Sequence, residues 1–356
     1  MYIKIDELQE GYIVQEDVMG KTSCPLISKG TVLTNRHIQF LKAFLIDEIE
    51  VEGEGVPVLQ LSGEEKHAEP QEFNTERPVI SNEEDFFDQF NQKEKRLKKE
   101  FQKWQSGMGI EMPAVRQMIL PLLEQVLANP DLCIKLHKCG NEAYDYHHPL
   151  ATALLSAGIA SQLHYEKGTV IQAALAGLLA DCGLAKLHPR LLAKQESKEF
   201  KAHPLYSYNM VKELSLLKSD AKLAILQHHE RLDGSGYPRG DRGDQVNALS
   251  RIIAVADTFH AMTAQTTADK RYPAFKALEM LKEDYFGKFD LTAVKALTAL
   301  FTKISPGTEV ELSNGQRGSI LFMKQNQPTR PLVQIHENST IVDLEKRRDL
   351  YIKEVR

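Results

Sequence analysis

The stretch AILQHHERLDGSGYPRGDRG, residues 224–243, combines an apolar helical segment with two histidines and a Gly-Tyr-Pro loop. His228 and His229 are adjacent, so on a regular helix their side chains point about 100° apart and do not share one ion comfortably. Two metal ions lying side by side would use both imidazoles. The stretch therefore indicates a metal site on a helical scaffold, and it raises the question of whether the rest of the chain completes that site.

Residues 113–302, which surround this stretch, show helical periodicity throughout. The apolar repeats predict at least seven helices, with abundant Ala and Leu inside them and Gly mostly at their boundaries, where helices stop. Strand-like alternation is not convincing anywhere in this region. We therefore expect a mainly α fold in which residues 113–302 form one all-α domain.

Two smaller modules flank the helical region. Residues 1–60 contain short alternating runs separated by Gly and Pro, which predict a small α+β module with one helix near residues 35–44. Residues 303–356 predict a small β region, because two alternating runs surround Asn314-Gly315, a strong hairpin signal. RPLVQIHE supplies a third strand of this region and LYIKEVR a fourth.

Residues 61–112 combine a polar linker with a charged helix. Ser81 and Glu84 match a capping box, which predicts a helix from about residue 83 to 106. The apolar residues of this helix form a narrow seam: Phe87, Phe90, Leu97, Phe101 and Trp104. Such a seam suits either a coiled-coil homodimer contact or packing against its own domain, and the sequence leaves both open.

Composition bounds the class of protein. The chain has 356 residues, 42% of them hydrophobic and 26% charged, with a formal net charge of −5, so nothing general points to nucleic acid. No secretory signal and no membrane span is expected. The four cysteines are scattered without a CxxC pair, which favours reduced thiols and a cytoplasmic location.

Further histidines and aspartates stand at the ends of predicted helices. Any one of them alone would be interpreted as a helix cap or a core residue. Six on four or five helices of one domain favour a metal site instead, and mixed imidazole and carboxylate ligands suit first-row divalent ions. The six candidate ligands are His148, Asp181, His203, His228, His229 and Asp257.

At this point a family resemblance becomes specific. HHERLDGSGYP is similar to the motif of the HD-GYP family, a branch of the HD metal-dependent phosphohydrolases. HHPLATALL resembles its first ligand helix, ALAGLLADCGLAKLHPRLL the segment of its His-Asp doublet, KAHPLYSYNMV its next histidine, and ALSRIIAVADTFHAMTA its final aspartate. The resemblance covers roughly residues 140–300, in matching order and approximate spacing.

The resemblance implies hydrolysis of cyclic di-GMP by metal-activated water in a bacterial signalling protein. It makes the six candidates metal ligands, with Asp181 bridging two ions, for which Fe or Mn is expected and Zn or Ni also fits. Asp181 and Lys186 would be catalytic, with Lys186 close to the phosphate. Gly236, Tyr237 and Pro238 would form the loop over the substrate.

This sequence departs from the family pattern in two functional parts. The doublet is Ala180-Asp181, so one ligand histidine is missing. The family's phosphate-binding arginine positions are occupied by Thr266 and Asp269, and Arg271 would replace them only if the loop were rearranged. Tyr144 stands where some relatives have a carboxylate for a third metal, which argues against three ions.

Two functions from different classes therefore stay open. The first is a cyclic di-GMP phosphodiesterase impaired by loss of one ligand and of the arginine clamp. The second is a catalytically inactive domain that acts as a cyclic di-GMP sensor or a dimeric scaffold. The loop is complete in both cases, whereas the metal site beneath it is altered.

Overall fold

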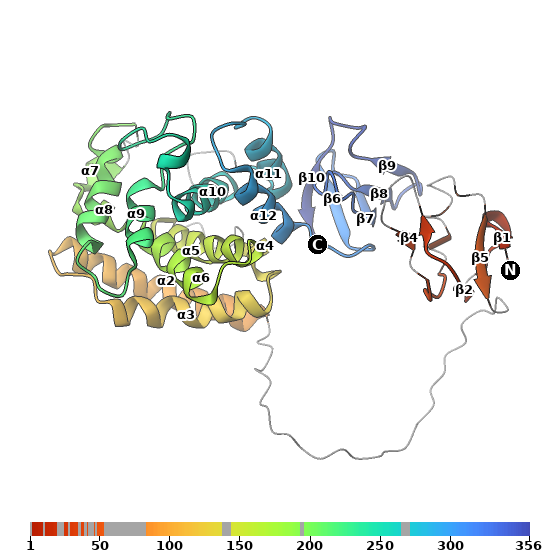
Figure 1. The fold of residues 1–356 in the computed structure, drawn as a ribbon, viewed down its shortest axis with the longest axis horizontal. Coiled ribbons are helices and arrows are strands. Elements are labelled where there is room, and N and C mark those ends of the chain that lie inside the picture. The colour runs from red at the N-terminus through yellow and green to blue at the C-terminus, as the bar shows by residue number, and fades with distance from the viewer. Residues whose placement is uncertain are drawn as a thin grey trace, which may run out of the picture. The chain divides into compact units, whose positions relative to one another are not determined.

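The computed structural model describes residues 83–136, 144–192, 196–264 and 271–356, together with parts of the first 52 residues. It divides into two compact units, Met1–Pro78 and Val79–Arg356, which are described separately here. Figure 1 shows the helices of the second unit and the strands of both units.

The first unit is built from short strands. β5 pairs antiparallel with β1 and with β2, and β3 pairs with β4. Val14 and Val51 are fully buried where β2 meets β5. The predicted strands are confirmed, whereas the helix expected near residues 35–44 falls largely outside the described residues. The strand bounds are β1 Tyr2–Lys4, β2 Ile13–Val14, β3 Val18–Met19, β4 Pro25–Ile27 and β5 Glu48–Glu52.

The second unit begins with a helical domain, which confirms the mainly α fold. Its α-helices are α2 Glu83–Gln105, α3 Met112–Ala128, α4 Leu132–Lys135, α5 Tyr144–Gln162, α6 Lys167–Leu179, α7 Pro189–Leu192, α8 His203–Val211, α9 Ser219–Gln227, α10 Ala248–Thr263, α11 Ala274–Lys282 and α12 Leu291–Phe301. Three short 3₁₀ turns, η3 Cys182–Lys186, η4 Phe200–Ala202 and η5 Gly243–Gln245, join some of them.

Helices α5 and α6 form the centre of this domain. Nearly every α5 residue from His147 to Ala160 is buried, so this helix has neighbours on all sides. On α6, a Cβ atom at Gly177 would lie 3.0 Å from the Ala153 Cα atom, so glycine permits the two backbones to approach closely. This close packing brings the end of α6, where Asp181 follows, beside the first turns of α5, which carry His148.

One described segment, Lys167–Lys186, has the length and the mean hydropathy, 1.5, that a membrane-spanning helix requires. No such run was predicted from the sequence. Of this window, 72% is buried, as expected for the central helix of a folded domain.

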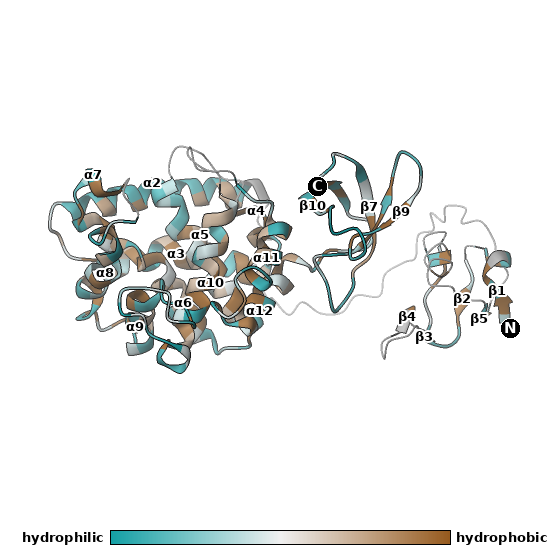
Figure 2. Ribbon diagram, turned by 90° about the horizontal axis from the view of Figure 1, so that it is seen from above, coloured by the Kyte–Doolittle hydropathy of each residue, from teal (hydrophilic) through white to brown (hydrophobic). Residues whose placement is uncertain are grey.

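Helix α2 packs against the helical domain to which its own chain folds. Phe86, Phe90, Leu97 and Trp104 are buried in the same core as α3 and α5, while charged residues colour much of the helix as hydrophilic in Figure 2. Of the two alternatives for the seam, the structure shows packing within the chain. The buried residue at its start is Phe86, whereas the predicted Phe87 is only partly buried. The proposed Ser81 cap lies outside the described residues.

The C-terminal residues form a five-stranded antiparallel sheet with the order β10-β6-β7-β8-β9. The hairpin at Asn314-Gly315 is confirmed, and Gly315 has φ +85°, a conformation that favours glycine. Arg330 binds Glu279 of α11, which ties the sheet to the helical domain within one unit. The strands are β6 Glu309–Leu312, β7 Arg317–Phe322, β8 Leu332–Ile335, β9 Ile341–Asp343 and β10 Ile352–Val355.

Candidate metal centre

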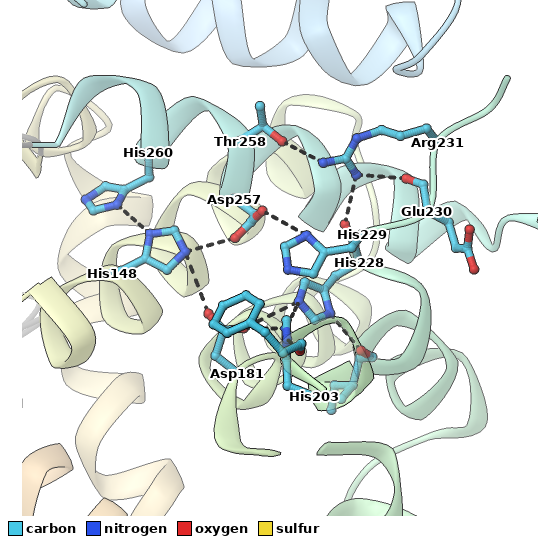
Figure 3. Close-up of polar contacts among 12 residues, drawn as sticks. His148, Asp181, His203, His228, His229, Glu230, Arg231, Asp257, Thr258 and His260 are labelled. Atoms are coloured by element: carbon cyan, nitrogen blue, oxygen red, sulfur yellow. Dashed lines mark hydrogen bonds and ion pairs between the residues drawn. The ribbon is translucent and has the colours of Figure 1, made fainter. Parts of the chain in front are cut away.

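The six predicted ligands come from five helical segments and converge in one buried centre (Figure 3). His148 lies near the start of α5, Asp181 directly after α6, and His203 at the first residue of α8. His228 caps the end of α9, His229 follows it, and Asp257 lies within α10. Helix ends are suitable positions for ligands, because the backbone there can turn a side chain toward the centre without interrupting a helix.

Four of these residues form one group of metal-type donors, the histidine-rich cluster: Asp181, His203, His228 and His229. One ligand atom from each lies within 4.8 Å of the others. Asp181 Oδ1 is 3.1 Å from His203 Nε2 and 3.4 Å from His228 Nε2. These distances leave the donors facing a common point, as they would around one ion.

The second group, the carboxylate-rich cluster, contains His148, Asp181 and Asp257. His148 Nε2 lies 2.8 Å from Asp257 Oδ1 and 3.8 Å from Asp181 Oδ2. Asp181 therefore belongs to both clusters, with one carboxylate oxygen toward each. Asp257 Oδ2 also lies 3.7 Å from His229 Nδ1, so the two clusters are contiguous.

Backbone carbonyls fix the imidazole orientation in the histidine-rich cluster. His203 Nδ1 donates to Phe200 O at 2.8 Å, and His228 Nδ1 donates to Ile225 O at 2.8 Å. A carbonyl only accepts, so both rings carry a proton on Nδ1 and turn Nε2 toward Asp181. Ligand histidines in metal sites are held in this way, with the second nitrogen donating to a fixed acceptor.

The electrostatics of the cluster favour metal ligation. Burial opposes charge on Asp181, but hydrogen bonds from His203 and His228 hold the pKa of this carboxyl well below its usual range. Burial and the neighbouring His228 lower the pKa of His229, so its imidazole is neutral and its lone pair is available. A charged carboxylate surrounded by imidazole nitrogens is a donor set that suits a divalent first-row ion.

Ala180 occupies the position of the missing histidine and is 3% exposed. It ends α6 directly before Asp181, the carboxylate that both clusters share. Among the described residues, three donors remain in that cluster, compared with four in the histidine-rich one. The two clusters are therefore unequal in the way that the sequence suggested.

The predicted cation Lys186 has another contact in this structure. Its ammonium donates to the Trp104 carbonyl oxygen at 2.8 Å, which joins η3 to the end of α2. Sequence position alone had placed it near the phosphate. To act there, its side chain would have to leave Trp104.

The Gly-Tyr-Pro loop is held over the histidine-rich cluster. The Tyr237 ring centroid lies 4.7 Å from that of His229, and 6.3 Å from that of His203. A Cβ atom at Gly236 would lie 2.4 Å from the Glu230 Cα atom, so no larger residue fits there without a shift. Tyr237 thus lies beside the metal-type donors, and contact of Gly236, Tyr237 and Pro238 with a substrate stays a prediction.

Glu230, which the sequence analysis did not select, organises this loop. Its side chain is 1% exposed, and its oxygens accept from the backbone N–H groups of Arg239, Gly240 and Asp241 at 2.7, 3.2 and 3.1 Å. The position of Glu230 in the sequence could have indicated this role, because an acid between two ligand histidines and a glycine-rich loop needs a hydrogen-bond partner when it is buried. Its three backbone partners could not be predicted from the sequence.

Arg271 lies in another part of the described structure. Arg271 lines a cavity between α4, the start of α11 and the C-terminal sheet, and no described residue of either cluster lines that cavity. It is thus not placed as a substitute for the arginine clamp. Thr266 and Asp269 lie outside the described residues.

Comparison with known proteins agrees with this geometry. Residues 121–292 match the family model of the HD domain. A cyclic di-GMP phosphodiesterase of Pseudomonas aeruginosa is 28% identical over 236 residues, covering 64% of this chain and 57% of that protein. A 3'3'-cGAMP-specific phosphodiesterase of Vibrio cholerae is 33% identical over 160 residues, covering 43% of this chain and 35% of that protein.

A cyclic di-GMP phosphodiesterase of Borreliella burgdorferi is 23% identical over 219 residues, covering 59% of this chain and 58% of that protein. The chain thus spans less than two thirds of the length of each of these three relatives. The family-model match, residues 121–292, includes all six residues of the two donor clusters. Residues 121–292 of this chain therefore resemble the HD domain family, and the motif that is similar to HD-GYP proteins falls within them.

Proposed function

We propose that this protein hydrolyses a phosphodiester bond of cyclic di-GMP at a centre that holds two divalent metal ions. The observation that carries the proposal is the position of Asp181, whose two carboxylate oxygens face different donor clusters. A carboxylate shared by two ions is the arrangement by which paired metals clamp a phosphoryl group. The named activities of the relatives, which act on cyclic di-GMP or 3'3'-cGAMP, support this substrate class.

The residues present fit such ions. The histidine-rich cluster would hold one ion through three imidazoles and Asp181, and the carboxylate-rich cluster would hold the other through His148, Asp181 and Asp257. Mixed nitrogen and oxygen donors suit Fe or Mn, and also Zn or Ni. We expect the second ion to bind more weakly, because its cluster has one donor fewer.

Divalent ions in such a centre lower the pKa of water and stabilise the charge that develops on a phosphoryl group. The protein's own contribution is to fix the donors and to cover the substrate. Phe200 O and Ile225 O hold the rings of His203 and His228, which in turn hold Asp181. Tyr237 lies over the histidine-rich cluster, where its hydroxyl and ring would contact the substrate.

The structure also supports one alternative from another class. Because Ala180 leaves the carboxylate-rich cluster with three donors, the chain would bind cyclic di-GMP without turnover if the second ion never bound. Such a protein would be a sensor or a dimeric scaffold. The apolar seam of α2 is buried within its own domain, so a homodimer through this helix would use its charged face.

One assay separates these functions. The full chain is loaded with Fe or Mn under anaerobic conditions, given cyclic di-GMP, and followed for the linear dinucleotide and GMP. Turnover that is abolished by Asp181→Ala and retained by Asp244→Ala, an exposed carboxylate outside both clusters, supports the enzyme. Binding without turnover supports the sensor. The absence of both binding and turnover would contradict both cyclic di-GMP functions.

A further inference from the structure

A second cavity lies apart from the metal centre. It has a volume of about 540 Å³ and is bounded by residues 129–135, 271–275, 303–308 and 353–356. These segments belong to α4, the start of α11, the link after α12, and β10, all within one compact unit (Figure 1). Sites for small molecules typically have volumes of about 300–1,000 Å³, so the cavity is large enough for a ligand of nucleotide size.

The cavity is positively charged. Its described lining carries five basic side chains against two acidic ones, Asp131 and Glu354. Glu311 neutralises a further charge by binding two of the basic residues, at 2.6 and 2.8 Å. The side chains of the lining therefore carry an excess of positive charge, which suits a phosphate monoester with its charge of about −1.5 to −2. The basic residues are Lys135, Arg271, Lys303, Lys353 and Arg356.

Two of these cations are available to a ligand. Arg271 and Lys303 are exposed, and neither forms an ion pair with another described residue. They come from different segments, one before α11 and one after α12, so the fold brings them to the same cavity. A guanidinium can bind a phosphate through two parallel hydrogen bonds, and an ammonium binds it as a point charge.

The wall also contains apolar and aromatic residues. Phe275 and Leu132 are buried at 2% and 5% exposure, whereas Tyr272 is 41% exposed. An exposed tyrosine ring beside cations offers a surface on which a planar ring can stack. We propose that this cavity binds a small phosphorylated molecule with a planar ring, of the class of a nucleoside monophosphate.

A ligand in this cavity would contact a segment that is joined to the metal centre. The Tyr272 backbone N–H donates to Met262 O at 2.9 Å, near the end of α10, the helix that carries Asp257. Phe275 packs in the core of the C-terminal sheet. The cavity is thus built from elements that connect the sheet to a ligand helix.

The test uses the full chain stripped of metal with a chelator, so that the metal centre does not contribute. Calorimetric titration with GMP should show binding to the unmodified chain. Arg271→Glu combined with Lys303→Glu should weaken this binding at least tenfold. Lys295→Glu, a charge reversal on an exposed α12 residue outside the cavity, should leave it unchanged. Circular dichroism checks that each variant is folded.

Two further titrations test the chemical class. Guanosine, which has no phosphate, and inorganic phosphate, which has no planar ring, should both bind more weakly than GMP. Tyr272→Ala should weaken GMP binding more than phosphate binding. Absence of GMP binding to the unmodified chain overturns the proposal, as does unchanged binding to the double variant. Equal affinity for GMP and inorganic phosphate overturns the planar-ring part of it.

Discussion

His148 Nδ1 lies 2.8 Å from His260 Nδ1, across 112 residues of sequence. The other nitrogen of the same ring, Nε2, lies 2.8 Å from Asp257 Oδ1, in the carboxylate-rich cluster (Figure 3). For Nε2 to act as a metal ligand, Nδ1 must carry the ring proton and donate it to His260. His260 thus orients His148 together with the Tyr144 hydroxyl, which lies 3.3 Å from the same nitrogen.

His260→Phe should therefore weaken metal binding at the carboxylate-rich cluster, by the factor of about 10–100 that loss of such an acceptor typically causes. The histidine-rich cluster does not contact His260 and should keep its ion. Metal titration by calorimetry, with elemental analysis of bound metal per chain, measures this difference. His260→Gln retains an amide oxygen that can accept the proton and should restore binding. A Phe variant with unchanged affinity for both ions would show that His260 does not position His148.

Glu230→Ala should loosen the Gly-Tyr-Pro loop while the donor clusters stay assembled. It removes the acceptor of three backbone N–H groups, and a buried donor left without a partner costs about 1–3 kcal/mol. We expect a lower free energy of unfolding in urea and faster amide exchange at residues 236–241. Glu230→Gln keeps one acceptor oxygen, so its free energy of unfolding and its exchange rate should lie between those of the unmodified chain and Glu230→Ala. Exchange in this loop equal to that of the unmodified chain would contradict the assignment.

Arg330→Met should detach the C-terminal sheet from α11. Arg330 and Glu279 are 11% and 7% exposed, and the other guanidinium nitrogen donates to the carbonyls of Leu344 and Leu350. Leaving a buried carboxylate without its partner costs about 3–5 kcal/mol. Combining Arg330→Met with Glu279→Leu should recover much of this loss. A double-mutant cycle by chemical denaturation measures the coupling energy between the two residues. Additive changes in the free energy of unfolding would show that the ion pair does not hold the sheet to α11.

Cys133 and Cys182 should resist alkylation in the folded protein even at pH 9. Burial raises the pKa of each thiol to about 12, so the reactive thiolate is scarce until far above its ordinary pKa near 9. Because the unfolded thiols ionise first as pH rises, this contribution to stability is present below pH 9 and decreases between about pH 9 and 12. Iodoacetamide labelling followed by peptide mass spectrometry checks each cysteine separately. Labelling of either residue at the rate of the urea-unfolded chain would contradict its burial.

The sequence predicted those parts of the structure that depend on local pattern or on a motif. The Asn314-Gly315 hairpin needs only its own turn residues, and the six donors follow from motif order. The contact of Lys186 with Trp104 could not be predicted, because the two residues are 82 positions apart and no local pattern encodes it. His260 was missed for the same reason, since a histidine on a helix acquires its role only from His148.

The seam of α2 shows the limit of periodicity. Phe86 and Phe87 are adjacent, so a helical spacing rule assigns either of them to the buried face. Packing against α3 and α5 decides in favour of Phe86. The strand β9 was also missed, because its three residues are too short for alternation to be recognised and its pairing with β8 defines it.

Ala180→His should increase the metal bound per chain. Ala180 directly precedes the shared Asp181, and the adjacent cluster has three of the donors that it needs, already held in position by buried neighbours. One added imidazole nitrogen would complete a pre-organised site, which is the situation in which a single ligand contributes most. We expect tighter binding of the second ion and, where phosphodiesterase activity is present, an increase in it.

Ala180→Gln is the matched control, because it adds a side chain of comparable size without an imidazole. It should leave the second ion as weakly bound as in the unmodified chain, and both variants should show the same helical circular dichroism as the unmodified chain. Because Ala180 is 3% exposed, the imidazole must occupy space beside α6 that the alanine leaves. A folded histidine variant that binds no more metal than the glutamine control would show that the site has closed around the alanine. The carboxylate-rich cluster would then be a structural remnant, and the sensor or scaffold function would be favoured over the enzyme.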